Sequence, residues 1–320
     1  MILSIFLSSF VIYLICFNGL YIGEKLGLLD KPNKGKIHKN NTPLLGGPII
    51  LIVLIIFLIF NLKINNIFVF HFYYMLSFFI LGLIDDRINL NAYYRILLVT
   101  VFSLILMTLD ESFVIDKIYF EISKSEYYFG KFKILVTLIC ILLLYIAINM
   151  SDGINCLLIS LSIFTIIAVN FLIYENSIDI FDTSFLFALI FLIYFNYKNK
   201  IFLGNSGASI ISSYFIYKLI NINFHDQVDV FEVISIFLII GIDMVRLVIT
   251  RIIKKKNPFS RDLNHFHHLL LKKMSLPLTI AFYLILSFGP VLITNIFNIS
   301  VIFIIPISVI IYFYTISKLN

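Results

Sequence analysis

Charged residues are scarce in this chain: they make up 13% of its 320 residues, whereas apolar residues make up 61%. A soluble domain usually carries about 25% charged residues. The long apolar runs, such as 48–60, 134–148 and 231–242, do not alternate in polarity, which argues against a membrane β-barrel. The composition therefore excludes an ordinary soluble domain and predicts an all-α integral membrane protein.

Cysteine is sparse as well. The three cysteines, Cys16, Cys140 and Cys156, have no paired spacing, so we expect neither a disulfide framework nor a thiolate metal site. The segment 1–23 lacks a basic start and a small-residue cleavage site. It is therefore predicted to be a first membrane span rather than a removed signal peptide.

The apolar runs predict a single polytopic domain over 1–320 with about eleven transmembrane helices of roughly 20 residues each. The predicted spans lie near 2–22, 46–62, 67–84, 93–109, 134–149, 157–174, 184–197, 208–222, 231–250, 278–295 and 299–316. The loop over 110–133 has two alternating stretches that can pair as a small hairpin.

Basic residues set the predicted orientation. Of the 24 lysines and arginines, 18 lie in one alternate set of loops, with the adjoining span ends and the C-terminus. The positive-inside rule makes this set cytoplasmic, so the N-terminus is expected outside and the C-terminus inside.

Polar residues gather in five short clusters, and all five fall on the predicted cytoplasmic side. They occupy 31–47, 85–95, 149–155, 202–207 and 261–268. Polar groups in so apolar a chain are costly and mark a functional site by default. We therefore expect one active site at the cytoplasmic face.

Asp85 and Asp86 stand side by side at the end of a predicted span. Adjacent carboxylates at a membrane boundary need a cation, a metal or a proton. We interpret them as a magnesium or acid–base site, with a pair of solvated loop acids as the alternative. Arg95 follows at the start of the next span, where it can face a phosphate.

Two further clusters lie near predicted helix ends. Asn149 and Asp152 are three residues apart, so one helical turn puts them on the same side, and Gly153 permits a turn. A capped helix end explains this pattern equally well. Gly204 and Asn205 belong to a turn that enters a span, where N–H groups suit an anion, although ordinary turn chemistry uses the same residues.

His265, His267 and His268 lie in the most basic loop. Because no second pair of ligands is visible, phosphate binding is favoured over zinc. The alternative is a positive-inside loop that happens to contain histidines. Asp243 and Arg246, three apart within a span, are expected to pair and to support the structure.

Lys36 and His38 belong to a basic, turn-rich loop that anionic lipid headgroups would attract.

Taken in order, the five clusters resemble the polyprenyl-phosphate N-acetylhexosamine-1-phosphate transferases of glycosyltransferase family 4. The resemblance covers nearly the whole chain. The Asp-Asp-Arg at 85–87 and the His-Phe-His-His at 265–268 look like the undecaprenyl-phosphate N-acetylglucosamine-1-phosphate branch. This resemblance implies that a UDP-sugar gives its sugar-1-phosphate to a polyprenyl phosphate at the cytoplasmic face, releasing UMP and priming a cell-surface glycan.

The resemblance also implies residue roles. Asp85 is the candidate base or lipid-phosphate partner, and Asp86 supports it and the metal. Asn149 and Asn205 occupy positions of metal ligands. The residues matched to substrate binding are Lys36, His38, Arg95, Asp152, Gly153, Gly204, His265, His267 and His268.

The implied cofactor is Mg²⁺, with Mn²⁺ as the alternative. The implied partners are UDP-N-acetylhexosamine, undecaprenyl phosphate and the lipid bilayer, with no nucleic acid. A homodimer is the assembly allowed for, and the bacterial inner membrane is the expected location.

Three positions depart from the family pattern. Asn205 replaces a metal-binding Asp, Asn155-Cys156 replaces an Asp-Gly, and Gly35-Lys36 replaces an Arg-Lys. A neutral amide gives a hard cation less than a carboxylate does. A catalytically weakened lipid- or nucleotide-binding relative is therefore a rival hypothesis. A lipid transporter is another, disfavoured because no internal repeat is apparent.

Overall fold

The computed structural model describes residues 2–32, 40–61, 66–170, 178–225, 228–259 and 262–319. The chain divides into two compact units, which are described separately. Unit 1 comprises Met1–Asp110 and Ile178–Phe215, and unit 2 comprises Glu111–Ser177 and Ile216–Asn320. The single domain over 1–320 stays a prediction.

Unit 1 is built almost wholly from helices. Its elements are α1 (Ile2–Phe17), α2 (Gly19–Leu26), β1 (Leu29–Asp30), β2 (Thr42–Pro43), α3 (Gly46–Asn61), α4 (Asn66–Ile88), α5 (Ala92–Leu109), α8 (Ile180–Tyr197) and the start of α9 (Gly204–His225). The two short strands pair antiparallel, with Leu29 opposite Pro43.

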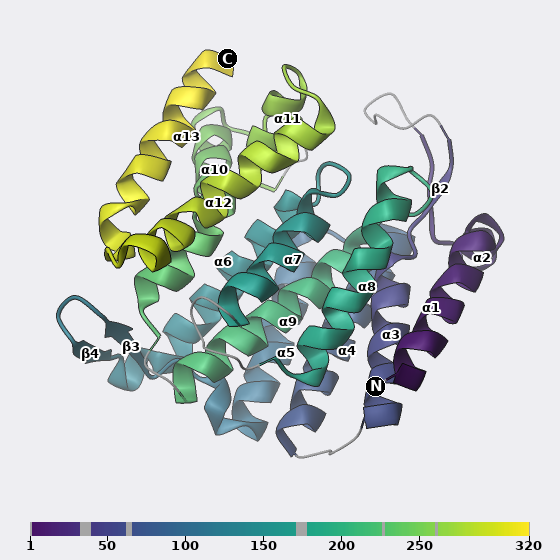
Figure 1. Ribbon diagram of the computed structural model, residues 1–320, viewed down its shortest axis with the longest axis horizontal. Helices are drawn as coiled ribbons and strands as arrows, with labels where there is room; N and C mark the ends of the chain where they lie inside the picture. Colours follow the sequence, from purple (N-terminus) through teal and green to yellow (C-terminus); the bar gives the residue numbers. More distant parts are fainter. Residues whose placement is uncertain are drawn as a thin grey trace. The chain divides into compact units, whose positions relative to one another are not determined.

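The core of unit 1 forms around α3, which packs against α1, α4 and α8 (Figure 1). This helix is apolar on every side, a pattern typical of a helix enclosed by others. Ile49, Val53, Leu54 and Phe57 are fully buried.

The predicted span over 2–22 is divided in the structure into α1 and α2, which meet at an angle of 75°. The break falls at Asn18, whose side chain donates to the carbonyl of Leu14 at 3.0 Å. Beyond it, Gly23 lets α2 approach β2, because a Cβ there would lie 2.9 Å from the Cβ of Pro43. Contact with a strand distant in sequence therefore turns this helix.

Unit 2 contains the remaining elements. They are η1 (Glu111–Phe113), β3 (Lys117–Phe120), β4 (Ser125–Tyr128), η2 (Gly130–Phe132), α6 (Lys133–Ser151), α7 (Leu157–Ala168), the rest of α9, α10 (Val230–Ile253), α11 (Phe266–Leu271), α12 (Leu276–Phe297), η4 (Val301–Phe303) and α13 (Ile305–Leu319).

In unit 2, α12 is the central helix and packs against α7, α10, α11 and α13 (Figure 1). The short helix α11 was not predicted, because the basic residues of 254–273 read as a loop. Its residues Phe266 and Leu270 are fully buried, and Phe266 contacts the rings of Tyr283 and Tyr312. Burial of these side chains holds the histidine-bearing segment on α12 and α13.

The predicted hairpin is confirmed. β3 and β4 pair antiparallel, with Lys117 opposite Tyr128 and Phe120 opposite Ser125. The hairpin rests on the start of α10, where Tyr119 forms a bridge with Asp229.

Seven of the described helical segments are long and apolar enough to cross a membrane, or eight if α1 and α2 form one bent span. They are Val69–Ile88, Ala92–Leu109, Gly130–Ser151, Ile180–Tyr197, Val230–Ile253, Leu276–Phe297 and Val301–Leu319. α3 and α7 are apolar but shorter. The chain is thus an all-α multi-pass protein, while the total of eleven spans stays a prediction.

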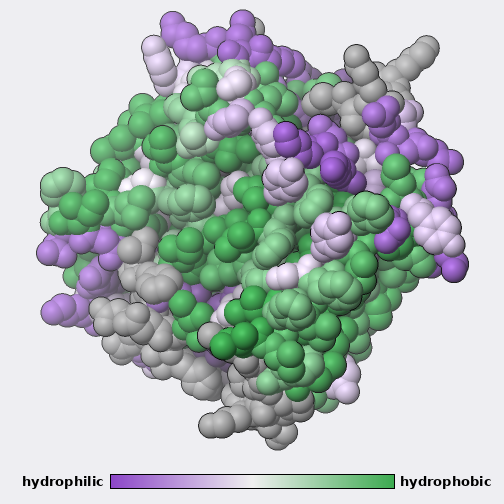
Figure 2. All heavy atoms as spheres, turned by 45° about the vertical axis from the view of Figure 1, so that its right-hand side comes forward, coloured by the Kyte–Doolittle hydropathy of each residue, from purple (hydrophilic) through white to green (hydrophobic). Residues whose placement is uncertain are grey.

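Apolar side chains dominate the face of the molecule seen in Figure 2. Large apolar side chains are widely exposed among the described residues; Ile2 and Phe6 on α1 are 85% and 72% exposed, and Ile296 on α12 is 70% exposed. Surfaces this apolar are unfavourable in water and suit contact with lipid.

Candidate active-site residues

Glycines hold the first turn of α9 tightly within unit 1. A Cβ added at Gly82 of α4 would lie 2.5 Å from the carbonyl oxygen of Asn205. One added at Gly47 of α3 would lie 2.5 Å from Oγ of Ser206. Gly47 also donates its N–H to the carbonyl of Leu203 at 3.2 Å. The absence of side chains therefore lets three helices meet backbone to backbone, and this fixes the end of α4 against the start of α9.

Asp86 lies at this junction and caps α9. Its Oδ1 accepts the N–H of Asn205 at 2.7 Å, and its Oδ2 accepts the N–H of Ser206 at 3.0 Å. Gly204 has a φ of 75°, and a Cβ there would lie 2.8 Å from Oδ2 of Asp86. The helix dipole and charge-assisted hydrogen bonds favour a carboxylate here. Within unit 1, the anion at the 202–207 turn is therefore the protein's own Asp86.

Asp85 has a different set of partners. It is 1% exposed, and its Oδ2 accepts a hydrogen bond from Nη1 of Arg95 at 3.0 Å. Its Oδ1 accepts the N–H of Leu90 at 2.7 Å. Arg95 thus supplies the counter-charge that the adjacent acids were expected to need. The two carboxylates therefore have different structural roles. Asp85 stabilises the turn between α4 and α5, whereas Asp86 caps the N-terminus of α9.

The sequence placed both aspartates at the cytoplasmic end of a span over 67–84, but α4 continues through Ile88 and includes them. Lys36 and His38, the first-loop candidates, lie outside the described residues.

The end of α6 in unit 2 carries the residues predicted for metal and nucleotide. Nδ2 of Asn149 donates to the carbonyl of Tyr145 at 2.8 Å. Asp152 is exposed and is the C-cap residue of α6, so the helix-end interpretation of this motif is correct for its backbone. Cys156 has a φ of 64°, in the left-handed region that favours glycine. The resemblance implies a glycine at this position. Glycine adopts this conformation without strain, so cysteine is an unusual residue here.

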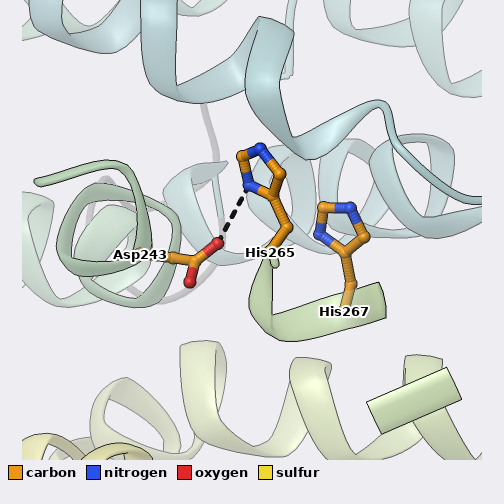
Figure 3. A group of neighbouring side chains, drawn as sticks. All are labelled: Asp243, His265 and His267. Atoms are coloured by element: carbon orange, nitrogen blue, oxygen red, sulfur yellow. Dashed lines mark hydrogen bonds and ion pairs between the residues drawn. The ribbon is translucent and has the colours of Figure 1, made fainter. Parts of the chain in front are cut away.

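One buried carboxylate anchors the histidine loop on α10 (Figure 3). Oδ2 of Asp243 lies 3.1 Å from Nδ1 of His265, and the N–H of Phe266 donates to the carboxylate at 3.2 Å. Nη2 of Arg246 and the hydroxyl of Tyr312 both donate to Oδ1 at 2.7 Å. The predicted pairing of Asp243 with Arg246 is confirmed, and the same carboxylate also organises the loop.

The three histidines pack together beside the end of α6. The rings of His265 and His267 are stacked, with their centroids 5.2 Å apart. The ring centroids of His267 and His268 are 4.4 Å apart. His267 is 1% exposed, and its ring nitrogens have no hydrogen-bond partner among the described residues. Its Nε2 lies against Gly153, where any Cβ would collide with the ring. Gly153 is therefore required for this packing.

Burial sets the protonation of two of these rings. It lowers the pKa of His267 well below the ordinary value of 6.5. Burial, together with the nearby His265, lowers the pKa of His268 to about 4. Both rings are therefore neutral at pH 7, when each carries one N–H donor and one acceptor nitrogen.

Asp243, His265 and His267 offer ligand atoms within 4.8 Å of one another. This group fits a cation poorly, because Asp243 already pairs with Arg246 at 2.7 Å and accepts three other donors. A metal ion here would sit beside a fixed positive charge. Hard cations also prefer oxygen ligands to imidazole nitrogens.

Sequence reasoning missed several residues that build these sites. Gly82 gave no signal in the sequence, since its close contacts with Asn205 and Ser206 join segments distant in the chain. Tyr312 on α13 was also missed, because nothing in its local sequence marks a hydroxyl that bonds to α10. Asp243 was predicted to pair with Arg246, but its contact with the histidine loop was not predicted, because that contact joins residues 22 positions apart.

The fold and these residues define a class: a multi-pass helical membrane protein with separate carboxylate and imidazole clusters. The family model described as Glycosyl transferase family 4 matches residues 69–223. This stretch includes Asp85, Asp86, Arg95, Asn149, Asp152, Gly153, Gly204 and Asn205, and it ends before the histidine loop.

Three bacterial relatives share the name undecaprenyl-phosphate alpha-N-acetylglucosaminyl 1-phosphate transferase. The one from Escherichia coli K12 is 26% identical over 284 residues, which cover 84% of this chain and 75% of the relative. That from Yersinia pestis is 28% identical over 291 residues, 83% of this chain and 77% of its own. The relative from Haemophilus influenzae is 27% identical over 285 residues, which cover 83% of this chain and 79% of the relative. The chain is thus similar to glycosyl transferase family 4 over residues 69–223 and to these relatives over most of its length.

Proposed function

We propose that this protein transfers N-acetylhexosamine-1-phosphate from a UDP-sugar to a polyprenyl phosphate at the cytoplasmic membrane face, with release of UMP. The observation that carries the proposal is the shared name of relatives that align with 84% of the chain, E. coli K12 among them. The carboxylate and imidazole clusters support it, because phosphoryl transfer depends on groups that position and neutralise phosphates.

In the proposed reaction, an oxygen of the lipid phosphate forms a bond to the phosphorus that carries the sugar. The bond from this phosphorus to the bridging oxygen breaks, and UMP leaves with the electron pair. Asp85 takes the proton of the acceptor phosphate or orients its oxygen. Arg95, hydrogen-bonded to Asp85 at 3.0 Å, offers its remaining N–H groups to phosphate oxygens.

The imidazoles of unit 2 suit the diphosphate, since His267 and His268 are neutral donors at pH 7 in a buried setting. Hydrogen bonds from buried donors are stronger toward an anion than those in water. Asp152 and Gly153 at the end of α6 are the proposed nucleotide contacts, and Lys36 and His38 the proposed first-loop contacts.

The proposed cofactor is Mg²⁺, or Mn²⁺ in its place. The positions proposed for its ligands are Asn149 and Asn205, and Asp86 is proposed to support the metal. When bound, the cation would lower the charge of the diphosphate and stabilise the leaving UMP. The neutral Asn205 gives this chain a weaker cation site than an aspartate would.

The proposed location is the bacterial inner membrane, with the N-terminus outside and the C-terminus in the cytoplasm. The basic residues of 254–256 support this orientation, since Lys254, Lys255 and Lys256 are all exposed at the end of α10. A homodimer stays a prediction.

The test uses the purified full-length protein with undecaprenyl phosphate, Mg²⁺ and a panel of UDP-sugars, scored for UMP release and for lipid-linked sugar. We expect UMP release that requires both lipid and cation, with UDP-N-acetylglucosamine among the active donors. Absence of transfer with every UDP-sugar, in protein that remains folded, would refute the proposal.

The weakened-relative hypothesis is retained because of Asn205 and Asn155, which are neutral where the family pattern has acids. It predicts that the protein binds UDP-sugar or polyprenyl phosphate with measurable affinity but releases no UMP. Activity that appears only after Asn205→Asp would favour it.

A further inference from the structure

Asp243 and His265 form a carboxylate–imidazole pair from two different segments of unit 2. Asp243 lies in the middle of α10, and His265 immediately precedes α11 (Figure 3). The pair is almost closed to solvent, since Asp243 is 3% exposed and His265 is 8% exposed. A carboxylate that accepts the Nδ1–H of a histidine fixes both the tautomer and the direction of the ring.

The carboxylate is itself fixed in place by two more side-chain donors. Arg246 donates to Oδ1 from the next turn of α10, and Tyr312 donates to Oδ1 from α13, both at 2.7 Å. Nε of Arg246 donates to the hydroxyl of Tyr312 at 2.9 Å, which closes a ring of three side chains. Asp243 therefore has little freedom to rotate away from His265.

The same group of hydrogen-bonded side chains also holds the backbone of the histidine loop. Nη2 of Arg246 donates to the carbonyl of Asn264 at 2.6 Å, and Asp243 accepts the N–H of Phe266 at 3.2 Å. The residues on both sides of His265 are thus tied to α10. Rotation of the His265 ring is restricted by its backbone as well as by its Nδ1 contact.

The orientation of His265 also affects the neighbouring ring. The rings of His265 and His267 are stacked with an interplanar angle of 15°, and Nε2 of His267 lies so close to Gly153 that a Cβ there would collide with it. A rotated His265 would lose this stacking contact with a buried ring. The carboxylate on α10 consequently controls the placement of two imidazoles.

We propose that Asp243 is a positioning residue: it holds His265 as the Nδ1–H tautomer, with Nε2 as the ring atom that meets a phosphate oxygen. The functional part of this inference rests on the proposed phosphotransferase activity. When Nε2 takes a proton from a phosphate hydroxyl, the ring becomes an imidazolium and Nε2 becomes a hydrogen-bond donor. The negative charge of Asp243 then balances the positive charge of the ring.

The chain contains a matched control for this role. Arg251 donates to Oδ2 of Asp262 at 3.0 Å, and Asp262 accepts the N–H of Asn264 at 2.8 Å. Asp262 is thus a second aspartate that ties the same loop to α10 through an arginine. It has no hydrogen bond to a histidine among the described residues.

The first measurement is of the tautomer in the resting protein, and it needs no activity. Full-length protein with ¹⁵N-labelled histidine is examined by NMR at pH 7.5, and the His265 signal is assigned by its loss in His265→Gln. We expect a protonated Nδ1 and a bare Nε2 in the wild type and in Asp262→Asn. A protonated Nε2 with a bare Nδ1 in the wild type would overturn the inference even if Asp243→Asn failed to fold.

The second measurement compares UMP release. Asp243→Asn is expected to lower kcat about 10–100-fold, the usual effect of removing a partner that orients a histidine. Asp262→Asn should stay within about threefold of wild type, and Asp243→Glu should recover part of the loss. Equal losses in Asp243→Asn and Asp262→Asn, at matched melting temperatures, would mean that Asp243 only supports the loop.

The two measurements separate this inference from the proposed function. If the wild type released no UMP with any UDP-sugar, the proposed function would fail. The tautomer of His265 and its dependence on Asp243 would still be decided by the NMR spectrum.

Discussion

Gly82 provides the sharpest test of how the carboxylate site is built. A Cβ at this position would lie 2.5 Å from both the carbonyl oxygen of Asn205 and Cα of Ser206. Carbon contacts are normally about 3.5–4.0 Å, so α4 and the first turn of α9 would have to separate by about 1 Å. Both obstructing atoms belong to the backbone, so no side-chain rotation can relieve the contact.

The expected loss of stability follows from three contributions. Overpacking costs about 1–3 kcal/mol. Replacing a helical glycine by alanine recovers about 0.5–1 kcal/mol. Separation of the helices also lengthens the hydrogen bonds of 2.7 and 3.0 Å from Asn205 and Ser206 to Asp86. A hydrogen bond to a charged group contributes about 1.5–3 kcal/mol, so we expect Gly82→Ala to destabilise unit 1 by roughly 1–4 kcal/mol.

The assay is thermal unfolding of the purified protein in detergent, together with UMP release. Gly241→Ala is the control, since Gly241 lies within α10 and a Cβ there meets nothing within 4 Å. The control should melt at or slightly above the wild-type temperature with unchanged turnover. Gly82→Ala should melt several degrees lower and turn over more slowly. If both variants behaved alike, the reasoning about the α4–α9 junction would be refuted.

The remaining predictions concern the cation, the acid pair, the histidines and the topology. Asn205→Asp should lower the Mg²⁺ concentration for half-maximal UMP release, and an unchanged requirement between pH 6 and 8 would show that the position binds no metal. Asp85→Asn should reduce turnover at least about 10²-fold while the protein still folds, and near-normal turnover would remove Asp85 from the catalytic assignment. His268 has a pKa lowered from 6.5 to about 4, so below pH 6.5 the unfolded chain binds a proton that the folded chain does not. Stability should therefore fall as the pH decreases from 6.5 toward 4, and less steeply in His268→Gln; denaturant titrations at several pH values measure this. In a background without the three native cysteines, Lys256→Cys should react with impermeant thiol reagents from the cytoplasmic side and Lys124→Cys from outside, and the reverse labelling would overturn the orientation.

Much of the helical architecture could be predicted because lipid-facing helices carry their signal locally. The spans near 93–109, 134–149 and 231–250 agree with α5, α6 and α10 to within a few residues. The hairpin over 117–128 followed from alternation in the chain. The bend between α1 and α2 did not, since it depends on contact between Gly23 and Pro43.

The candidate residues were predictable as types but not as partners. The sequence identified Asp85, Asp86 and the histidines, because polar groups are conspicuous in an apolar chain. That Arg95 faces a phosphate stays a prediction, and its hydrogen bond to Asp85 was not foreseen. The sequence predicted an anion at the start of α9, and that anion is the carboxylate of Asp86.

The sequence by itself determined that this is a polytopic helical membrane protein, and it identified the polar residues that are candidates for function. Both follow from local properties: the hydropathy of a segment and the presence of polar residues within or beside it. Only the tertiary structure decided how those residues are held. Asp86 reaches α9 through glycine contacts across more than a hundred residues of sequence, and Asp243 meets His265 and Tyr312 from three separate segments. Hydrogen bonds of this kind depend on distances between helices, and tertiary packing sets those distances.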